Sequence, residues 1–71
     1  MADEVRAHIT GVVFQVVAQP GARVAVGDPI LILESMKMEI PVEAPRAGVV
    51  QAVPVAEGQT VQEGDVVALL E

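Results

Sequence analysis

The chain has 71 residues, with ten acidic and four basic side chains and a formal net charge of −6. A chain this short buries only about 60% of its unfolded surface, so we expect one domain over residues 1–71. The negative charge would repel nucleic acid backbones and anionic lipid surfaces, which leaves other proteins as the expected partners.

The N-terminal segment, MADEVRAH, is acidic and is not followed by an apolar run long enough for a signal sequence or a membrane span. The chain has no cysteine, so it has no disulfide framework and no thiolate metal site, and it suits a reducing compartment. We therefore expect a soluble, unprocessed, cytoplasmic protein. A single histidine among scattered acids predicts no metal site.

An internal repeat organises the elements that follow. Residues 5–34 align with residues 42–71 at an offset of 37, and no gap is needed. All six glycines match under this alignment, as Gly11 with Gly48, Gly21 with Gly58, and Gly27 with Gly64. Shared glycines imply shared backbone conformations, so the two copies should fold alike, with residues 35–41 as the joint between them.

Short Val-rich runs separated by turn residues predict about four strands in each copy. The hydrophobic residues make up 52% of the chain and the aromatic residues 1%, so we expect an aliphatic core with Phe14 as its only ring. The spacing leaves no room for helices between strands and favours two antiparallel sheets packed as a sandwich. The predicted strands are 3–8, 12–18, 23–26, 29–34, 38–43, 49–55, 60–63 and 66–71.

Two details of these strands bear on the site. Val13 and Val16 recur as Val50 and Val53, and this spacing of three predicts a bulge in each copy. The run 30–33 is apolar on both faces and predicts the most buried strand. That strand should pair with 38–43 as a hairpin whose tip is formed by residues 35–37.

Lys37 is the only lysine, and it lies in the joint, so the repeat does not dictate its place. A solubilising turn residue is the simplest interpretation of an exposed lysine. Met36 and Met38 argue against it, because a surface turn gains little from two flexible apolar side chains. They are either gap-fillers packed under the turn or an adaptable collar that a modifying enzyme recognises.

The motif ESMKME, from Glu34 to Glu39, resembles the attachment motif of biotinyl domains, in which two methionines flank a lysine. The similarity continues through Gly11, the turns at 21–24 and 27–28, and Ala44-Pro45, and is greatest to small free-standing biotin/lipoyl attachment proteins. It implies an all-β flattened barrel of two four-stranded antiparallel sheets with pseudo-twofold symmetry. Two departures stand out: Ser35 replaces a common alanine, and residues 8–11 replace a common Pro-Met-x-Gly.

The resemblance also implies the chemistry. Biotin protein ligase would attach biotin covalently to Lys37, and biotin carboxylase and carboxyltransferase would use it in turn. The chain would be a monomeric carrier without catalytic residues. Recognition by the ligase would involve the residues around the lysine, namely Glu34, Ser35, Met36, Met38 and Glu39.

Three alternatives remain. A lipoyl carrier domain of a 2-oxo acid dehydrogenase-type complex, with lipoate on Lys37, has the same fold, although lipoyl motifs usually place an acid before the lysine and a small residue after it. A hydrolase could use His8 with Ser35 or an acid, although no nucleophile motif surrounds them. A structural adaptor, such as the lipoyl-like hairpin domains of membrane-fusion proteins, would have no need of a Met-Lys-Met tip.

Overall fold

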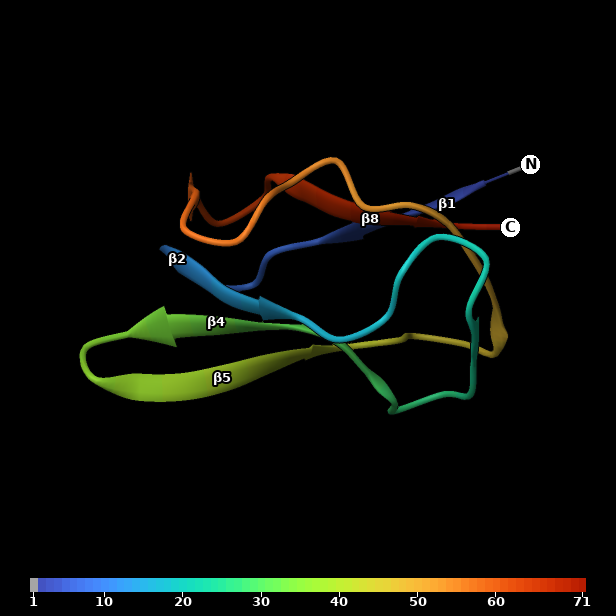
Figure 1. Cartoon of the computed structure of the whole chain (residues 1–71), viewed down its shortest axis with the longest axis horizontal. Coiled ribbons are helices and arrows are strands. Elements are labelled where there is room, and N and C mark those ends of the chain that lie inside the picture. Colours follow the sequence, from blue (N-terminus) through green and yellow to red (C-terminus); the bar gives the residue numbers. More distant parts are fainter. Residues whose placement is uncertain (1) are drawn as a thin grey trace.

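Two four-stranded antiparallel sheets, facing each other, make up the computed structural model, which describes residues 2–71 (Figure 1). All eight strands predicted from the sequence are present. They are β1 (Asp3–Arg6), β2 (Gly11–Val16), β3 (Arg23–Val24), β4 (Pro29–Ser35), β5 (Met38–Glu43), β6 (Gly48–Ala52), β7 (Thr60–Val61) and β8 (Val66–Leu70).

Each sheet takes strands from both copies of the repeat. The strand orders are β1-β8-β6-β3 and β5-β4-β2-β7. The repeat relates each strand of the first sheet to one strand of the second. β1 corresponds to β5, β8 to β4, β6 to β2 and β3 to β7, so the two sheets have the same order. The predicted all-β sandwich of two four-stranded antiparallel sheets with pseudo-twofold symmetry is therefore confirmed.

The predicted bulges occur at equivalent positions in the two copies. The register of β2 against β4 shifts between Val13 and Gln15, and that of β6 against β8 shifts between Val50 and Ala52. The extra residues are Phe14 and its repeat partner Gln51. The bulge leaves both Phe14 and Gln15 on the exposed side, between buried Val13 and Val16, which packs against the core, and Phe14 is 48% exposed. The expectation that Phe14 supplies a ring to the core is wrong.

The core is aliphatic, as the composition predicts, and β4 runs through its centre. Ile30, Leu31 and Leu33 have no exposed surface, and β4 is hydrogen-bonded to β5 on one side and β2 on the other. Ile30 and Leu31 are both buried although adjacent, because the β4–β5 register shifts between Pro29 and Leu31. This strand therefore has a fixed position and register up to the base of the hairpin.

Six of the eight predicted strands end one to three residues earlier than expected, namely those at 3–8, 12–18, 23–26, 49–55, 60–63 and 66–71. The N–H groups of Val17 and Ala18 both donate to the Ile30 carbonyl at 2.9 Å, so the ladder stops and β2 ends at Val16. β6 ends at Ala52, two residues before Pro54, which has no N–H to donate. β1 ends at Arg6, which leaves His8 exposed in a bend and not on a strand.

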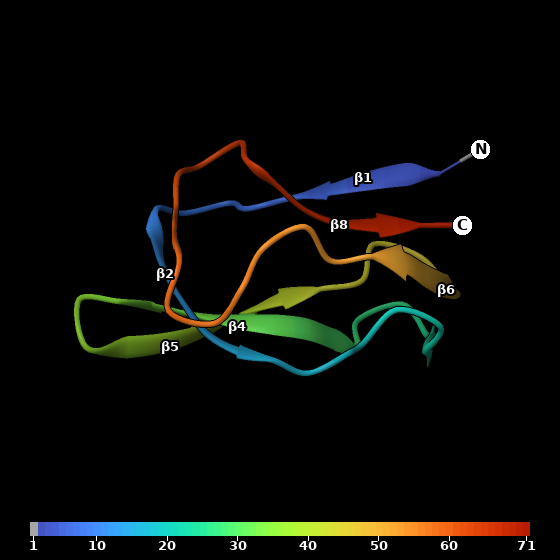
Figure 2. The same ribbon diagram turned by 45° about the horizontal axis from the view of Figure 1, so that its top comes forward.

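The two ends of the molecule differ (Figures 1 and 2). At one end a turn joins the paired strands β4 and β5 into a hairpin. At the opposite end, where both termini lie, the corresponding strands β8 and β1 pair between Leu70 and Asp3 without a joining turn. The molecule is elongated, with extents of 32 × 17 × 17 Å, so these ends are well separated.

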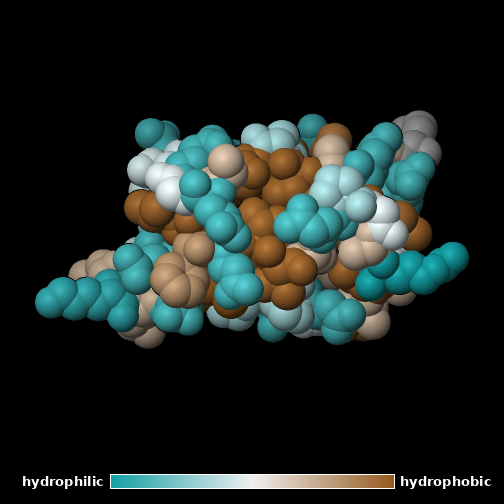
Figure 3. Space-filling model, viewed as in Figure 1, coloured by the Kyte–Doolittle hydropathy of each residue, from teal (hydrophilic) through white to brown (hydrophobic). Residues whose placement is uncertain are grey.

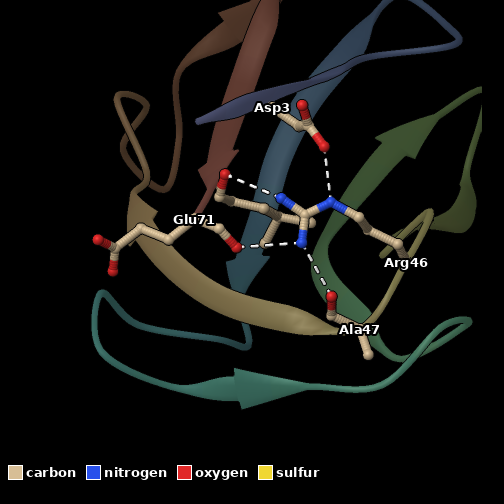
Figure 4. A network of polar contacts seen from close by, with 5 residues as sticks. Asp3, Arg46, Ala47 and Glu71 are labelled. Atoms are coloured by element: carbon tan, nitrogen blue, oxygen red, sulfur yellow. Dashed lines mark hydrogen bonds and ion pairs between the residues drawn. The ribbon is translucent and has the colours of Figure 1, made fainter. Parts of the chain in front are cut away.

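Arg46 binds the strands together at the end that holds the termini (Figure 4). Its Nε donates to the Asp3 carboxylate at 2.6 Å, and its terminal nitrogens donate to the carbonyls of Leu70 (3.3 Å), Glu71 (3.0 Å) and Ala47 (2.9 Å). One guanidinium thus connects β1, the end of β8 and the start of β6. The repeat partner of Arg46 is Ile9, so this contact has no counterpart at the hairpin end.

We predict that Arg46→Ala lowers the free energy of unfolding by about 1–2 kcal/mol, because the Leu70 and Glu71 carbonyls lose a charged donor in a partly exposed site. Arg23→Ala is the matched control, since exposed Arg23 makes none of the side-chain hydrogen bonds found within residues 2–71. Urea denaturation of both variants provides the measurement. Equal stabilities would contradict the assigned role of Arg46.

Candidate functional site

A two-residue turn ends the β4–β5 hairpin. The last cross-strand pairs are Glu34 with Glu39 and Ser35 with Met38, so the turn consists of Met36 and Lys37. The predicted tip of residues 35–37 is one residue too long, because Ser35 belongs to β4 and is paired. Lys37 lies at the tip, as predicted.

The turn has an uncommon backbone conformation for its sequence. Met36 and Lys37 have φ values of 52° and 65°, and within residues 2–71 they are the only non-glycine residues with positive φ. Two successive positive φ values define a type I′ turn, which usually contains Asn-Gly. For other L-residues the left-handed region costs about 1–2 kcal/mol per residue. The strained residues lie at the tip of the hairpin. Because strained backbone residues cluster at functional sites, the tip is the candidate site.

Both methionines are exposed, Met36 by 92% and Met38 by 63%. The interpretation of these residues as gap-fillers packed under the turn is wrong. Along the core-facing side of β5, burial falls from Val42 (2% exposed) through half-buried Ile40 to Met38. The hairpin therefore extends past the core, and its tip projects from the body of the molecule (Figure 3).

Two glutamates of the hairpin, Glu34 and Glu39, flank the turn that carries Lys37, and neither forms an ion pair with it. Its ammonium forms no ion pair with any carboxylate of residues 2–71, where the two ion pairs found are Arg6–Glu4 and Arg46–Asp3. Glu34 and Glu39 are exposed and directly opposite each other, an arrangement of like charges that disfavours strand pairing. Successive cross-strand pairs face opposite sides, so the acidic pair lies on one side of the hairpin and Ser35 with Met38 on the other.

Gly11 allows β2 to approach the base of the hairpin. A Cβ at this position would lie 2.7 Å from the Glu34 carbonyl oxygen and 3.5 Å from the Ser35 Cβ. The clash would be with backbone, which cannot rotate aside, so only glycine fits without moving the hairpin. From the sequence, Gly11 stood out only as a glycine matched in the repeat and as part of the resemblance to biotinyl domains. The available signal in the sequence was its repeat partner Gly48, where an added Cβ would lie 2.9 Å from the Glu71 carbonyl oxygen.

The residues considered for a hydrolase are not assembled. His8 is exposed and makes no hydrogen bond to Ser35, to Thr10 or to a carboxylate within the described chain. The Thr10 hydroxyl instead accepts the Glu63 N–H at 3.2 Å. Neither a pocket nor a group of three potential metal ligands occurs in residues 2–71, and that segment has no helix that could span a membrane.

Comparison with known proteins identifies small relatives that this chain covers over most of their length. The family described as "Biotin-requiring enzyme" (Biotin_lipoyl) matches residues 2–70. The biotinylated protein TB7.3 homolog of Mycobacterium leprae is 47% identical over 70 residues, which cover 99% of each chain. The biotin carboxyl carrier protein of acetyl-CoA carboxylase from Solanum lycopersicum is 42% identical over 58 residues, 82% of this chain and 83% of that protein.

The structural comparison gives the same fold within a much larger protein. The crystal structure of Kluyveromyces lactis urea carboxylase superposes with a TM-score of 0.95 and 34% identity. The match covers 100% of this chain but only 6% of the urea carboxylase chain. This fold therefore occurs both as a small protein and as a minor part of a large enzyme.

The strain in the turn gives a testable prediction. The double substitution Met36→Asn and Lys37→Gly should raise the free energy of unfolding by about 1–2 kcal/mol, because Asn-Gly adopts the type I′ conformation at lower cost. The control with Met36→Ala and Lys37→Ala removes the same side chains without relieving the backbone, and it should give no such gain. Chemical denaturation measures both. A gain of equal size in the control would contradict the assignment of strain.

Proposed function

We propose, from the premise that this chain belongs to the biotin-requiring enzyme (Biotin_lipoyl) family, that it is a biotin carboxyl carrier with biotin attached at Lys37. The observation that carries the proposal is the position of the only lysine at the exposed end of a strained hairpin. The relatives named for biotin support the choice of cofactor. On this proposal residues 1–71 act as one carrier unit.

The residues at the tip fit covalent attachment of biotin. The Lys37 amine would attack the biotin carboxyl group after the ligase has activated it, the activating group would leave with one carboxyl oxygen, and an amide would form. The amine is not held in an ion pair by residues 2–71, so no internal bond has to break first. Attachment removes one positive charge and leaves three basic and ten acidic residues, a formal charge of −7 in place of −6. Attached biotin would supply the carboxyl-carrying chemistry.

The residues around Lys37 would serve recognition by biotin protein ligase. Met36 and Met38 offer exposed apolar surface without a structural role in the core. Glu34 and Glu39 keep like charges opposite each other at a cost to strand pairing, which argues that a partner uses them. Ser35 completes the set as the half-buried residue paired with Met38.

The fold supports the carrier by presenting the lysine rigidly. Because Ile30, Leu31 and Leu33 of β4 are buried, the base of the hairpin holds its position while the tip extends outward. A tethered group on such a pedestal has a high effective concentration at any active site that it can reach. The chain itself is non-catalytic, and the transfer chemistry belongs to its partners.

The proposed partners are a biotin protein ligase, a biotin carboxylase and a carboxyltransferase, in the cytoplasm, with the carrier as a monomer. The similarity to a segment of a urea carboxylase and to a carrier of acetyl-CoA carboxylase supports the two carboxylase partners. The tip is narrow and lies at one end of an elongated molecule, so active sites of more than one enzyme can receive it.

Intact mass of the protein tests the attachment. The protein produced together with a biotin protein ligase should gain the mass of one biotinyl group, located by peptide mapping at Lys37. Lys37→Arg keeps the positive charge and the turn but provides no amine for amide formation, so it should gain nothing. The same variant should support no carboxyl transfer in a reconstituted carboxylase.

Two results would reject the proposal. A biotinyl group on the Lys37→Arg variant would place the attachment elsewhere. A lipoyl increment on Lys37, in protein produced with both biotin and lipoate ligases, would make the chain a lipoyl carrier, which is the alternative with the same fold.

A further inference from the structure

The side chains of this protein that oxidants attack most readily are concentrated beside Lys37. The chain has no cysteine, no tryptophan and no tyrosine, and three methionines. Two of these are Met36 and Met38, with exposed fractions of 92% and 63%. Susceptibility to oxidation follows exposure, so the thioethers at the tip are open to small peroxides.

We propose that Met36 and Met38 are a reversible oxidation site that controls whether Lys37 can be biotinylated. The proposal rests on the proposed function. The reactant is a peroxide. The thioether sulfur attacks one peroxide oxygen, the O–O bond breaks, the sulfur loses two electrons and becomes a sulfoxide, and the other oxygen leaves as water after taking up protons.

Oxidation changes the chemistry of the tip but not of the core. A methionine sulfoxide is polar and accepts hydrogen bonds, whereas the thioether is apolar and adaptable. A ligase surface that buries two apolar side chains would have to bury two sulfoxide oxygens without partners. The fold does not oppose the change, because both side chains lie outside the aliphatic core formed by β4 and its neighbours.

The position of the site makes its effect local. Met36 and Met38 are the immediate neighbours of Lys37, and Met36 shares the strained turn with it. The amine itself is unchanged by peroxide, so the lysine remains available while its surroundings become polar. Sulfoxide reductases restore the thioether, which makes the change reversible.

The experiment compares biotinylation before and after oxidation. The unbiotinylated protein is treated with hydrogen peroxide, the peroxide is removed with catalase, and kcat/KM for biotin protein ligase is measured. We expect kcat/KM to fall about tenfold or more, because burial of unpaired polar groups is unfavourable. Peptide mapping should find sulfoxides at Met36 and Met38, and methionine sulfoxide reductases should restore the rate.

A double variant, Met36→Leu and Met38→Leu, is the matched control. It keeps apolar side chains at both positions and cannot form sulfoxides there, so its ratio of treated to untreated kcat/KM should stay near one, whatever its untreated rate. It also retains Met1 and therefore controls for oxidation of that residue. Thermal unfolding of treated and untreated protein checks that the fold is unaffected.

Each contrary outcome has a distinct meaning. Sulfoxides at both positions with an unchanged rate, or an equal loss of rate in the leucine variant, would overturn the proposed control while leaving Lys37 as the attachment site. Absence of sulfoxides after peroxide treatment would overturn the oxidation site itself. Failure of the untreated protein to be biotinylated would reject the proposed function, and the control with it.

Discussion

Burial of β4 is the constraint on which the rest of the structure depends. The strand lies between β5 and β2, and Ile30, Leu31 and Leu33 are completely buried against the opposite sheet. Its register fixes the last two cross-strand pairs of the hairpin and thereby the place where the chain must turn. Because the turn has only two residues, the backbone of Lys37 has a fixed position at the end of the molecule.

The near symmetry of the two copies makes the differences between them informative. The pairing of β4 with β5 and that of β8 with β1 have register shifts at equivalent points, and the bulges of β2 and β6 coincide. At one end the pairing continues into a strained turn that carries a lysine. At the other end a guanidinium, Arg46, connects strands that no turn joins. The repeat thus supplies one scaffold, and the two ends give it different uses.

The exposed apolar residues follow from the same geometry. Met38 lies on the core-facing side of β5, but the hairpin extends beyond the opposite sheet and no core remains for Met38 to enter. Phe14 follows buried Val13 on β2 and faces outward at the bulge. An overhanging hairpin therefore provides apolar surface without weakening the core. This arrangement suits the proposed contact of the tip with successive partners, and it exposes two thioethers to oxidants.

The sequence alone determined much of this protein. The offset of 37 residues predicted two equivalent halves, the Val spacing predicted both bulges, and the position of the only lysine between the halves predicted the tip. These features depend on local backbone preferences and on the alternation of apolar residues, which are written in the order of the chain. The resemblance of Glu34 to Glu39 to a known attachment motif added the cofactor.

Only the tertiary structure decided which apolar side chains lie in the core and which contacts close the ends. Alternation assigns Met38 and Val42 to one face, but how far that face is covered depends on the opposite sheet. The close approach at Gly11 and the carbonyls gathered around Arg46 come from strands distant in sequence. Phe14 follows buried Val13 and faces outward, and the one-residue bulge keeps Gln15 on the exposed side as well and returns Val16 to the core.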